Sequence, residues 1–170
     1  MLESSKIAGK HIDTVWETQW VESPAKGELL VSISSDGRII EWSMKKGLEH
    51  RDLLTIKKPT NPNTKDDKES TVFRQAAGFT LDFPLGESLL YLVGTEEGTI
   101  HKCSVSYNDD LDTFWGHSGP VYRVRTSPFW PHIMLTCSAD WTVMVWNWKR
   151  DEGIALTCDS TDLTDAVTDI

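Results

Sequence analysis

A pattern that occurs three times along the chain constrains its fold more than any other feature. Each copy is an apolar run, a short turn with an acidic residue and a second alternating run: LLVSISSDGRIIEW, LLYLVGTEEGTIHKC and IMLTCSADWTVMVW. The acidic turn residues are Asp36, Glu97 and Asp140. The second runs close six residues later, at Trp42, Cys103 and Trp146. Two alternating runs joined by a tight turn predict a β-hairpin, so the chain contains three copies of one hairpin unit.

Each hairpin has a further strand on either side. The segments DTVWETQW, AGFTLDF and GPVYRVRTSP precede the three hairpins, and HRDLLTI and LDTFW follow the first two. In the third of the preceding segments, Arg123 and Arg125 fall on one side of a strand and Tyr122 and Val124 on the other. The repeating unit is therefore a four-stranded antiparallel meander, and no helix is expected.

The spacing of the units identifies the architecture. The acidic turn positions lie 61 and 43 residues apart, and the second value matches the period of about 40–45 residues of WD-repeat blades. We predict an all-β fold, a WD-repeat β-propeller with about three four-stranded blades of an incomplete, seven-bladed ring. Because propellers close with four to eight blades, we expect a fragment or short form of a longer protein. The predicted boundaries are a lead-in at 1–10, blades at 11–56, 76–115 (degenerate) and 116–158, a flexible polar insertion at 57–75, and the truncated start of a further blade at 159–170.

Two of the three copies carry the polar residues of the WD-repeat family, which they resemble. That pattern places a His before the inner strand, a Ser or Thr on the second strand, an Asp in the turn and a Trp on the third strand. The resemblance implies two structural tetrads, His11, Ser32, Asp36 and Trp42 in the first copy and His117, Thr136, Asp140 and Trp146 in the third. A buried polar chain of this kind is stable only when every partner is satisfied. The middle copy lacks the pattern, so we expect its blade to rely on packing alone.

Composition and motifs exclude several classes of function. A net charge of −9 disfavours nucleic acid and anionic membranes as partners, and no apolar run reaches the length of a membrane span. Three cysteines without CxxC spacing favour reduced, buried thiols over a zinc site. A catalytic dyad of His117 and Asp140 with Thr136 as nucleophile is disfavoured, because the pair recurs with the repeat. We therefore expect no enzyme activity, no catalytic residue, no metal, no cofactor and no small-molecule substrate.

A narrower resemblance rests on three phrases in this order: VGTEEGTIHKC in the middle copy, SPFWP after the third inner strand, and SADWTVMVW with Trp in the turn. Together with KHIDTVWETQW, they resemble the propeller of dynein intermediate chains, especially the axonemal group, over roughly residues 9–148. The resemblance implies a non-catalytic scaffold subunit that docks on a dynein heavy chain, with other dynein intermediate and light chains as partners. It also implies assembly of dynein arms for ciliary or flagellar movement, and a place in the cytoplasm, the cytoskeleton and the axoneme. Between the two arms we favour the inner.

The alternative that shares the fold is an adaptor of another intracellular assembly, such as a ubiquitin-ligase substrate receptor or a trafficking coat. In either case the partner would bind at variable groups on the propeller rims. Aromatic and arginine side chains are the usual anchors of interfaces. The candidate contacts are Trp141, Arg123, Arg125, Phe129 and Trp130. Phe129 and Trp130 could instead pack under a neighbouring blade, whereas Trp115 and Trp148 are expected in the core.

Overall fold

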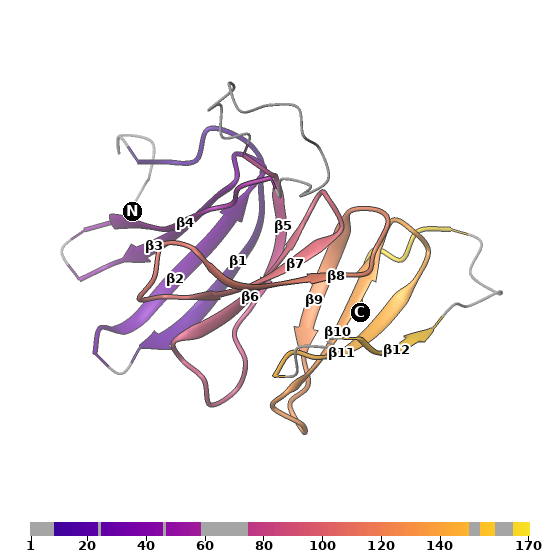
Figure 1. Cartoon of the computed structure of the whole chain (residues 1–170). Coiled ribbons are helices and arrows are strands. Elements are labelled where there is room, and N and C mark those ends of the chain that lie inside the picture. The colour runs from indigo at the N-terminus through magenta and orange to yellow at the C-terminus, as the bar shows by residue number, and fades with distance from the viewer. Residues whose placement is uncertain (1–8, 24, 46, 59–74, 150–153, 159–164) are drawn as a thin grey trace, which may run out of the picture.

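Three four-stranded antiparallel sheets make up the molecule. The computed structural model describes residues 9–23, 25–45, 47–58, 75–149, 154–158 and 165–170, with backbone only at 154–158. The sheets stand side by side in chain order, from the indigo N-terminal sheet to the yellow C-terminal one (Figure 1). Within each sheet the strands follow one another along the chain, as in a meander. The prediction of an all-β fold in three four-stranded blades is confirmed, and the described residues contain no helix.

The strands have the following bounds. Blade 1 consists of β1 (Val15–Ser23), β2 (Gly27–Ser34), β3 (Arg38–Ser43) and β4 (Glu49–Thr55). Blade 2 consists of β5 (Gly78–Asp82), β6 (Leu90–Thr95), β7 (Thr99–Ser104) and β8 (Asp110–Trp115). Blade 3 consists of β9 (Val121–Thr126), β10 (Ile133–Ser138), β11 (Val143–Asn147) and β12 (Ile154–Cys158).

The inner strands β1, β5 and β9 lie next to one another and run in the same direction. Near their starts, the rings of Trp16, Phe79 and Tyr122 form a chain of contacts, with centroids 5.0 and 6.1 Å apart. Because the three sheets are aligned, their equivalent connections lie at the same ends. We call the end with the β2–β3, β6–β7 and β10–β11 turns the turn rim, and the opposite end the loop rim.

The hydrophobic core lies between the blades. One cluster joins Val31 and Ile33 of blade 1 to Tyr91 and Val93 of blade 2. A second cluster joins residues of blade 2 to residues of blade 3, among them Leu92, Ile100, Phe114, Met134, Trp146 and Trp148. Since alternate residues of a strand point to opposite faces, β6 is buried on both sides. Blade 2 is thus packed between its two neighbours.

The remaining boundary predictions concern the insertion and the C-terminal end. Most of the predicted insertion 57–75 lies outside the described residues, but its ends Lys57 and Gln75 form an antiparallel bridge. Of the predicted start of a further blade, residues 165–170 are described and form no strand. There the Val167 N–H donates to the Ser138 carbonyl, 3.4 Å away. The described residues include no helix of the length and apolarity that a membrane crossing needs.

Candidate docking surface

Blades 1 and 3 each contain a buried chain of four polar side chains that fixes the turn rim. In blade 3, His117 Nδ1 lies 3.0 Å from Asp140 Oδ2, and its Nε2 lies 2.7 Å from Thr136 Oγ1. The indole N–H of Trp146 donates to the same hydroxyl over 2.7 Å. The strand register makes this possible, because Trp146 is paired with Met134, two residues before Thr136.

Blade 1 repeats this geometry. His11 Nε2 lies 2.7 Å from Ser32 Oγ, which accepts from the Trp42 indole over 2.7 Å. On its other side His11 Nδ1 lies 3.1 Å from Asp36 Oδ2. The structure therefore brings both sets of four residues together as hydrogen-bonded chains that join the start of the inner strand to the turn.

The ionisation of these groups suits a structural role. Burial lowers the pKa of His117, and Asp140 beside it only partly offsets this. Burial alone would raise the pKa of Asp140, but hydrogen bonds from Thr142, the Ser118 N–H and His117 outweigh it, so this pKa is lowered. A neutral imidazole therefore faces a carboxylate near pH 7. The Thr136 hydroxyl is fully buried and already accepts an indole N–H, so it is closed to a substrate.

Blade 2 replaces the four-residue chain with a different polar network. His101 on β7 is buried, with Nε2 3.1 Å from Thr99 Oγ1 and Nδ1 3.2 Å from Asp110 Oδ2. The hydroxyl of Thr113 donates to the same carboxylate over 2.7 Å. The expectation that this blade relies on packing alone is therefore wrong. The sequence signal was the alternation of Thr99, His101 and Cys103, which places three small or polar groups on one buried face.

The candidate contact residues fall into separate places. Trp141 lies in the β10–β11 turn, half-exposed on the turn rim. Phe129 and Trp130 lie in the β9–β10 loop on the loop rim, with 84% and 65% of their surfaces exposed, so no neighbouring blade covers them in this structure. Of the two tryptophans expected in the core, Trp148 is buried, but Trp115 is 57% exposed, because it ends β8 at the open edge of blade 2.

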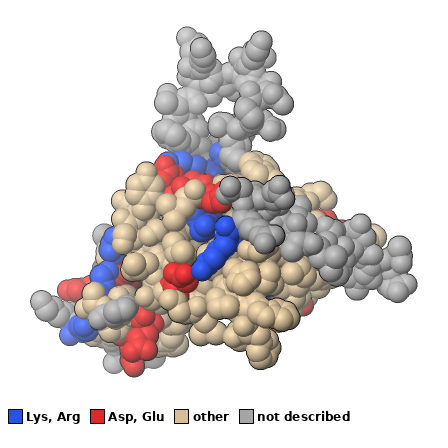
Figure 2. Space-filling model, turned by 60° about the horizontal axis from the view of Figure 1, so that its bottom comes forward, with Lys and Arg blue, Asp and Glu red and all other residues tan. Residues whose placement is uncertain are grey.

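Arg123 and Arg125 are held by a carboxylate that the sequence reading did not single out. Arg125 Nη2 donates to Glu17 Oε1 over 2.7 Å, and Arg123 Nη1 lies 3.4 Å from the same oxygen. Arg123 also pairs with Asp169 at 2.9 Å. These two guanidinium groups are therefore engaged within the chain rather than free for a partner. Figure 2 shows basic side chains with acidic neighbours in the middle of a largely uncharged face.

Glu17 is the centre of a network that crosses the three inner strands. Its second oxygen accepts the Thr80 hydroxyl at 2.7 Å and the Leu81 N–H at 3.0 Å. Asp82, the residue after Leu81 on β5, accepts a hydrogen bond from the Gln19 amide at 3.3 Å and from Thr126 N and Oγ1 at 2.6 Å each. These side-chain hydrogen bonds connect the inner strands of the three blades, as backbone hydrogen bonds connect the strands within one sheet. The signal in the sequence is a polar residue at alternate positions of every inner strand.

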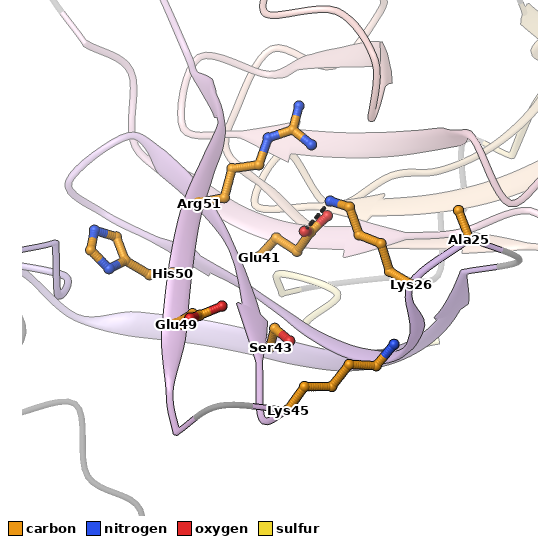
Figure 3. Close-up of a pocket in the computed structure, with 8 residues that line it drawn as sticks. All are labelled: Ala25, Lys26, Glu41, Ser43, Lys45, Glu49, His50 and Arg51. Carbon is orange, nitrogen blue, oxygen red and sulfur yellow. Dashed lines mark hydrogen bonds and ion pairs between the residues drawn. The ribbon is translucent and has the colours of Figure 1, made fainter.

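A shallow pocket of about 300 Å³ lies on blade 1 at the loop rim (Figure 3). Lys26, Lys45 and Arg51 reach into it from three segments, and Lys26 is paired with Glu41. Glu49 lines the same pocket, so the opposite charges nearly balance. This pocket offers no set of groups that converges on a single ligand. Within the described ranges, no three His, Cys, Asp or Glu side chains converge to hold a metal ion.

Comparisons with known proteins agree with the sequence resemblance. Dynein axonemal intermediate chain 4 of Mus musculus is 46% identical over 160 residues, which are 86% of this chain and 20% of that protein. Dynein intermediate chain 2, ciliary, of Heliocidaris crassispina is 37% identical over 174 residues, 100% of this chain and 24% of that protein. The chain thus spans about a fifth to a quarter of the length of these relatives. No protein-family model matches the chain.

The fold agrees with a solved structure. The crystal structure of the WD40 β-propeller domain of Doa1 superposes with a TM-score of 0.70 at 18% sequence identity, covering 94% of this chain and 45% of that one. At this identity the likeness concerns the fold alone. The chain therefore consists of WD-repeat β-propeller blades, and its sequence resembles the axonemal dynein intermediate chains.

Proposed function

We propose that the chain is a non-catalytic scaffold part of an axonemal dynein complex, in which its blades dock on a dynein heavy chain. Its neighbours in the complex would be other dynein intermediate and light chains, and its place the axoneme of a cilium or flagellum. The single observation that carries this proposal is the 46% identity to an axonemal dynein intermediate chain over 86% of the chain. A role in inner-arm assembly is part of the proposal.

The state of the buried polar groups supports a scaffold rather than an enzyme. The hydroxyls of Ser32 and Thr136 are the only nucleophile candidates beside an imidazole in the two tetrads, and each already accepts an indole N–H. Both hydroxyls lie below the surface. Exposed aromatic side chains lie on both rims: Trp141 on the turn rim, and Phe129 and Trp130 on the loop rim. Exposed aromatic groups on a rigid scaffold fit protein docking.

The test is affinity capture with the tagged chain from an extract of ciliated cells, followed by quantitative mass spectrometry. The proposal predicts enrichment of axonemal dynein heavy chains together with light chains. The double variant Phe129→Ala/Trp130→Ala tests whether the loop rim takes part in docking, because both side chains are exposed and their loss should leave the fold intact. Recovery of ubiquitin-ligase or coat components without dynein would instead establish the adaptor role.

A further inference from the structure

The blades at the two ends of the row each leave one sheet face without a neighbouring blade. We call the face of a blade toward the preceding blade its front face, and the face toward the following blade its rear face. The front face of blade 2 carries Tyr91 and Cys103, which pack against blade 1. Counted from the acidic turn residues, the same positions in blade 1 are Leu30 and Trp42, which line a shallow hollow of about 300 Å³ together with Val15. The front face of blade 1 is therefore apolar and hollowed where another blade would pack.

Blade 3 leaves the opposite face open. The rear face of blade 2 carries Leu92 and Ile100, which pack against blade 3. The same positions in blade 3 are Leu135 and Val143, which are both apolar and partly buried. Each junction between the blades of this chain joins a rear face to a front face. The rear face of blade 3 and the front face of blade 1 are therefore the two halves of one further junction.

The C-terminal residues 165–170 mark the place on blade 3 where the next inner strand belongs. The Val167 N–H lies 3.4 Å from the Ser138 carbonyl, and Asp169 accepts from Arg123 Nε over 2.9 Å. Cys137, which pairs with Arg123 and belongs to the rear face, is fully buried. The side chain of Asp169 is 70% exposed. Because one long hydrogen bond and one exposed ion pair contribute little stability, this segment can be displaced at low cost.

The start of β1 has the same pattern as this C-terminal segment. Val15 pairs with Ser34 in blade 1 as Val121 pairs with Ser138 in blade 3, so both valines begin an inner strand at the same place. Two residues later the first blade has a carboxylate, in Val15-Trp16-Glu17, and so has the C-terminal segment, in Val167-Thr168-Asp169. The corresponding residues of β5 and β9 are Thr80 and Arg123. Of the three inner strands, β1 alone could therefore offer Arg123 a carboxylate in place of Asp169.

We propose that two copies of this chain associate head to tail, with blade 1 of each copy packed on the rear face of blade 3 of the other, and close a six-bladed ring. Propellers close with about four to eight blades, and a junction that forms twice gives the ring a two-fold axis. In each junction β1 of one copy displaces residues 165–170 of the other. Val15 then takes the place of Val167, and Glu17 that of Asp169. This inference concerns how the chain covers its own open faces, and it does not rest on the proposed function.

The first test is the mass of the purified full chain, measured by size-exclusion chromatography with multi-angle light scattering. We expect twice the chain mass of 19.2 kDa. Val15→Glu puts a charge into the junction and should give the mass of one chain, with an unchanged circular dichroism spectrum because 44% of the Val15 surface is exposed. The matched control Leu85→Glu changes an exposed side chain on the loop rim and should stay dimeric. A wild-type mass of one chain would leave the open faces to other partners and overturn the inference.

A disulfide test examines the register of the junction. Where blades 2 and 3 meet, a Cβ on Gly94 would lie 3.1 Å from the Val121 Cβ, and Cys137 with Val15 of the second copy is the corresponding pair. This is close to the separation of about 3.5–4.5 Å between the Cβ atoms of a disulfide. In a Cys158→Ser background, Val15→Cys should therefore give a disulfide-linked dimer on mild oxidation, and adding Cys137→Ser should abolish it.

Three results on a non-reducing gel would contradict the proposed junction. Absence of the linked dimer would refute the register. A dimer that persists with Cys137→Ser would show that blade 1 meets blade 1. A ladder of longer products would show that the copies form an open row instead of a closed ring.

Discussion

Replacing Glu17 with alanine should loosen all three blades, because this one carboxylate joins β1 to both other inner strands. The side chain is only 12% exposed, and it accepts hydrogen bonds from Thr80, Leu81 and Arg125. Its loss leaves the Leu81 N–H without its acceptor, which costs about 1–3 kcal/mol when the group stays buried. Arg125 is 37% exposed and can turn to solvent, so the ion pair adds at most about 1 kcal/mol.

We therefore expect Glu17→Ala to lower the free energy of unfolding by about 2–3 kcal/mol. For a chain of this size, the melting temperature would fall by about 4–12 °C. The assay is urea unfolding followed by tryptophan fluorescence and by circular dichroism. Both probes should report a single transition at a lower midpoint, since the blades share the network.

The control is Glu22→Ala, which removes an exposed carboxylate from the same strand and should change the free energy by less than about 0.5 kcal/mol. A double-mutant cycle with Arg125→Ala separates the ion pair from the other hydrogen bonds. If Glu17→Ala unfolds within about 0.5 kcal/mol of the wild type, the network does not hold the blades together and the reasoning fails.

Three further predictions concern the buried polar groups. Thr136→Val should destabilise the fold by about 2–4 kcal/mol in urea unfolding, because His117 and the Trp146 indole both lose a buried partner; a change under about 0.5 kcal/mol would contradict this. Stability should decline as pH falls below about 6.5, since the folded state lowers the pKa of His117 and the unfolded chain takes up the proton first. A second decline below about pH 4 follows from the lowered pKa values of Asp36, Asp110 and Asp140, and Asp140→Asn should make this second decline smaller. Burial raises the pKa of Cys103 and raises that of Cys137 to about 11. A Cys158→Ser variant, which keeps only these two thiols, should therefore not react with Ellman's reagent at neutral pH until urea is added. Rapid reaction without urea would refute the burial of the two thiols.

Features that recur in more than one blade could be predicted from the sequence, whereas interactions that occur only once could not. The three hairpins were visible because each turn joins two alternating runs, and the tetrads because their residues recur at fixed places in the pattern. The network of His101 was missed because it occurs in one blade alone and has no second copy to reveal it. Glu17 was missed for another reason: its partners lie on strands of other blades, over 60 residues away, and only the packing of the sheets brings them together.

The residues at the rims show a similar division. Whether Phe129 is exposed depends on whether another part of the fold covers its loop, and the local sequence pattern does not indicate this. Conversely, the turn at Asp140-Trp141 was evident from the sequence, but the sequence does not show that Trp141 adopts a positive φ of 68°, close to the values of Gly37 and Gly98 in the other two turns. Local signals therefore located the elements, and contacts between blades decided the roles of the side chains.

The central claim is that this chain docks on an axonemal dynein heavy chain. Its most direct test is biolayer interferometry between the purified chain and a purified heavy chain stripped of its intermediate chains, at increasing salt. The account predicts saturable binding at low salt. Absence of binding at low salt, with a chain whose cooperative unfolding shows that it is folded, would contradict the account.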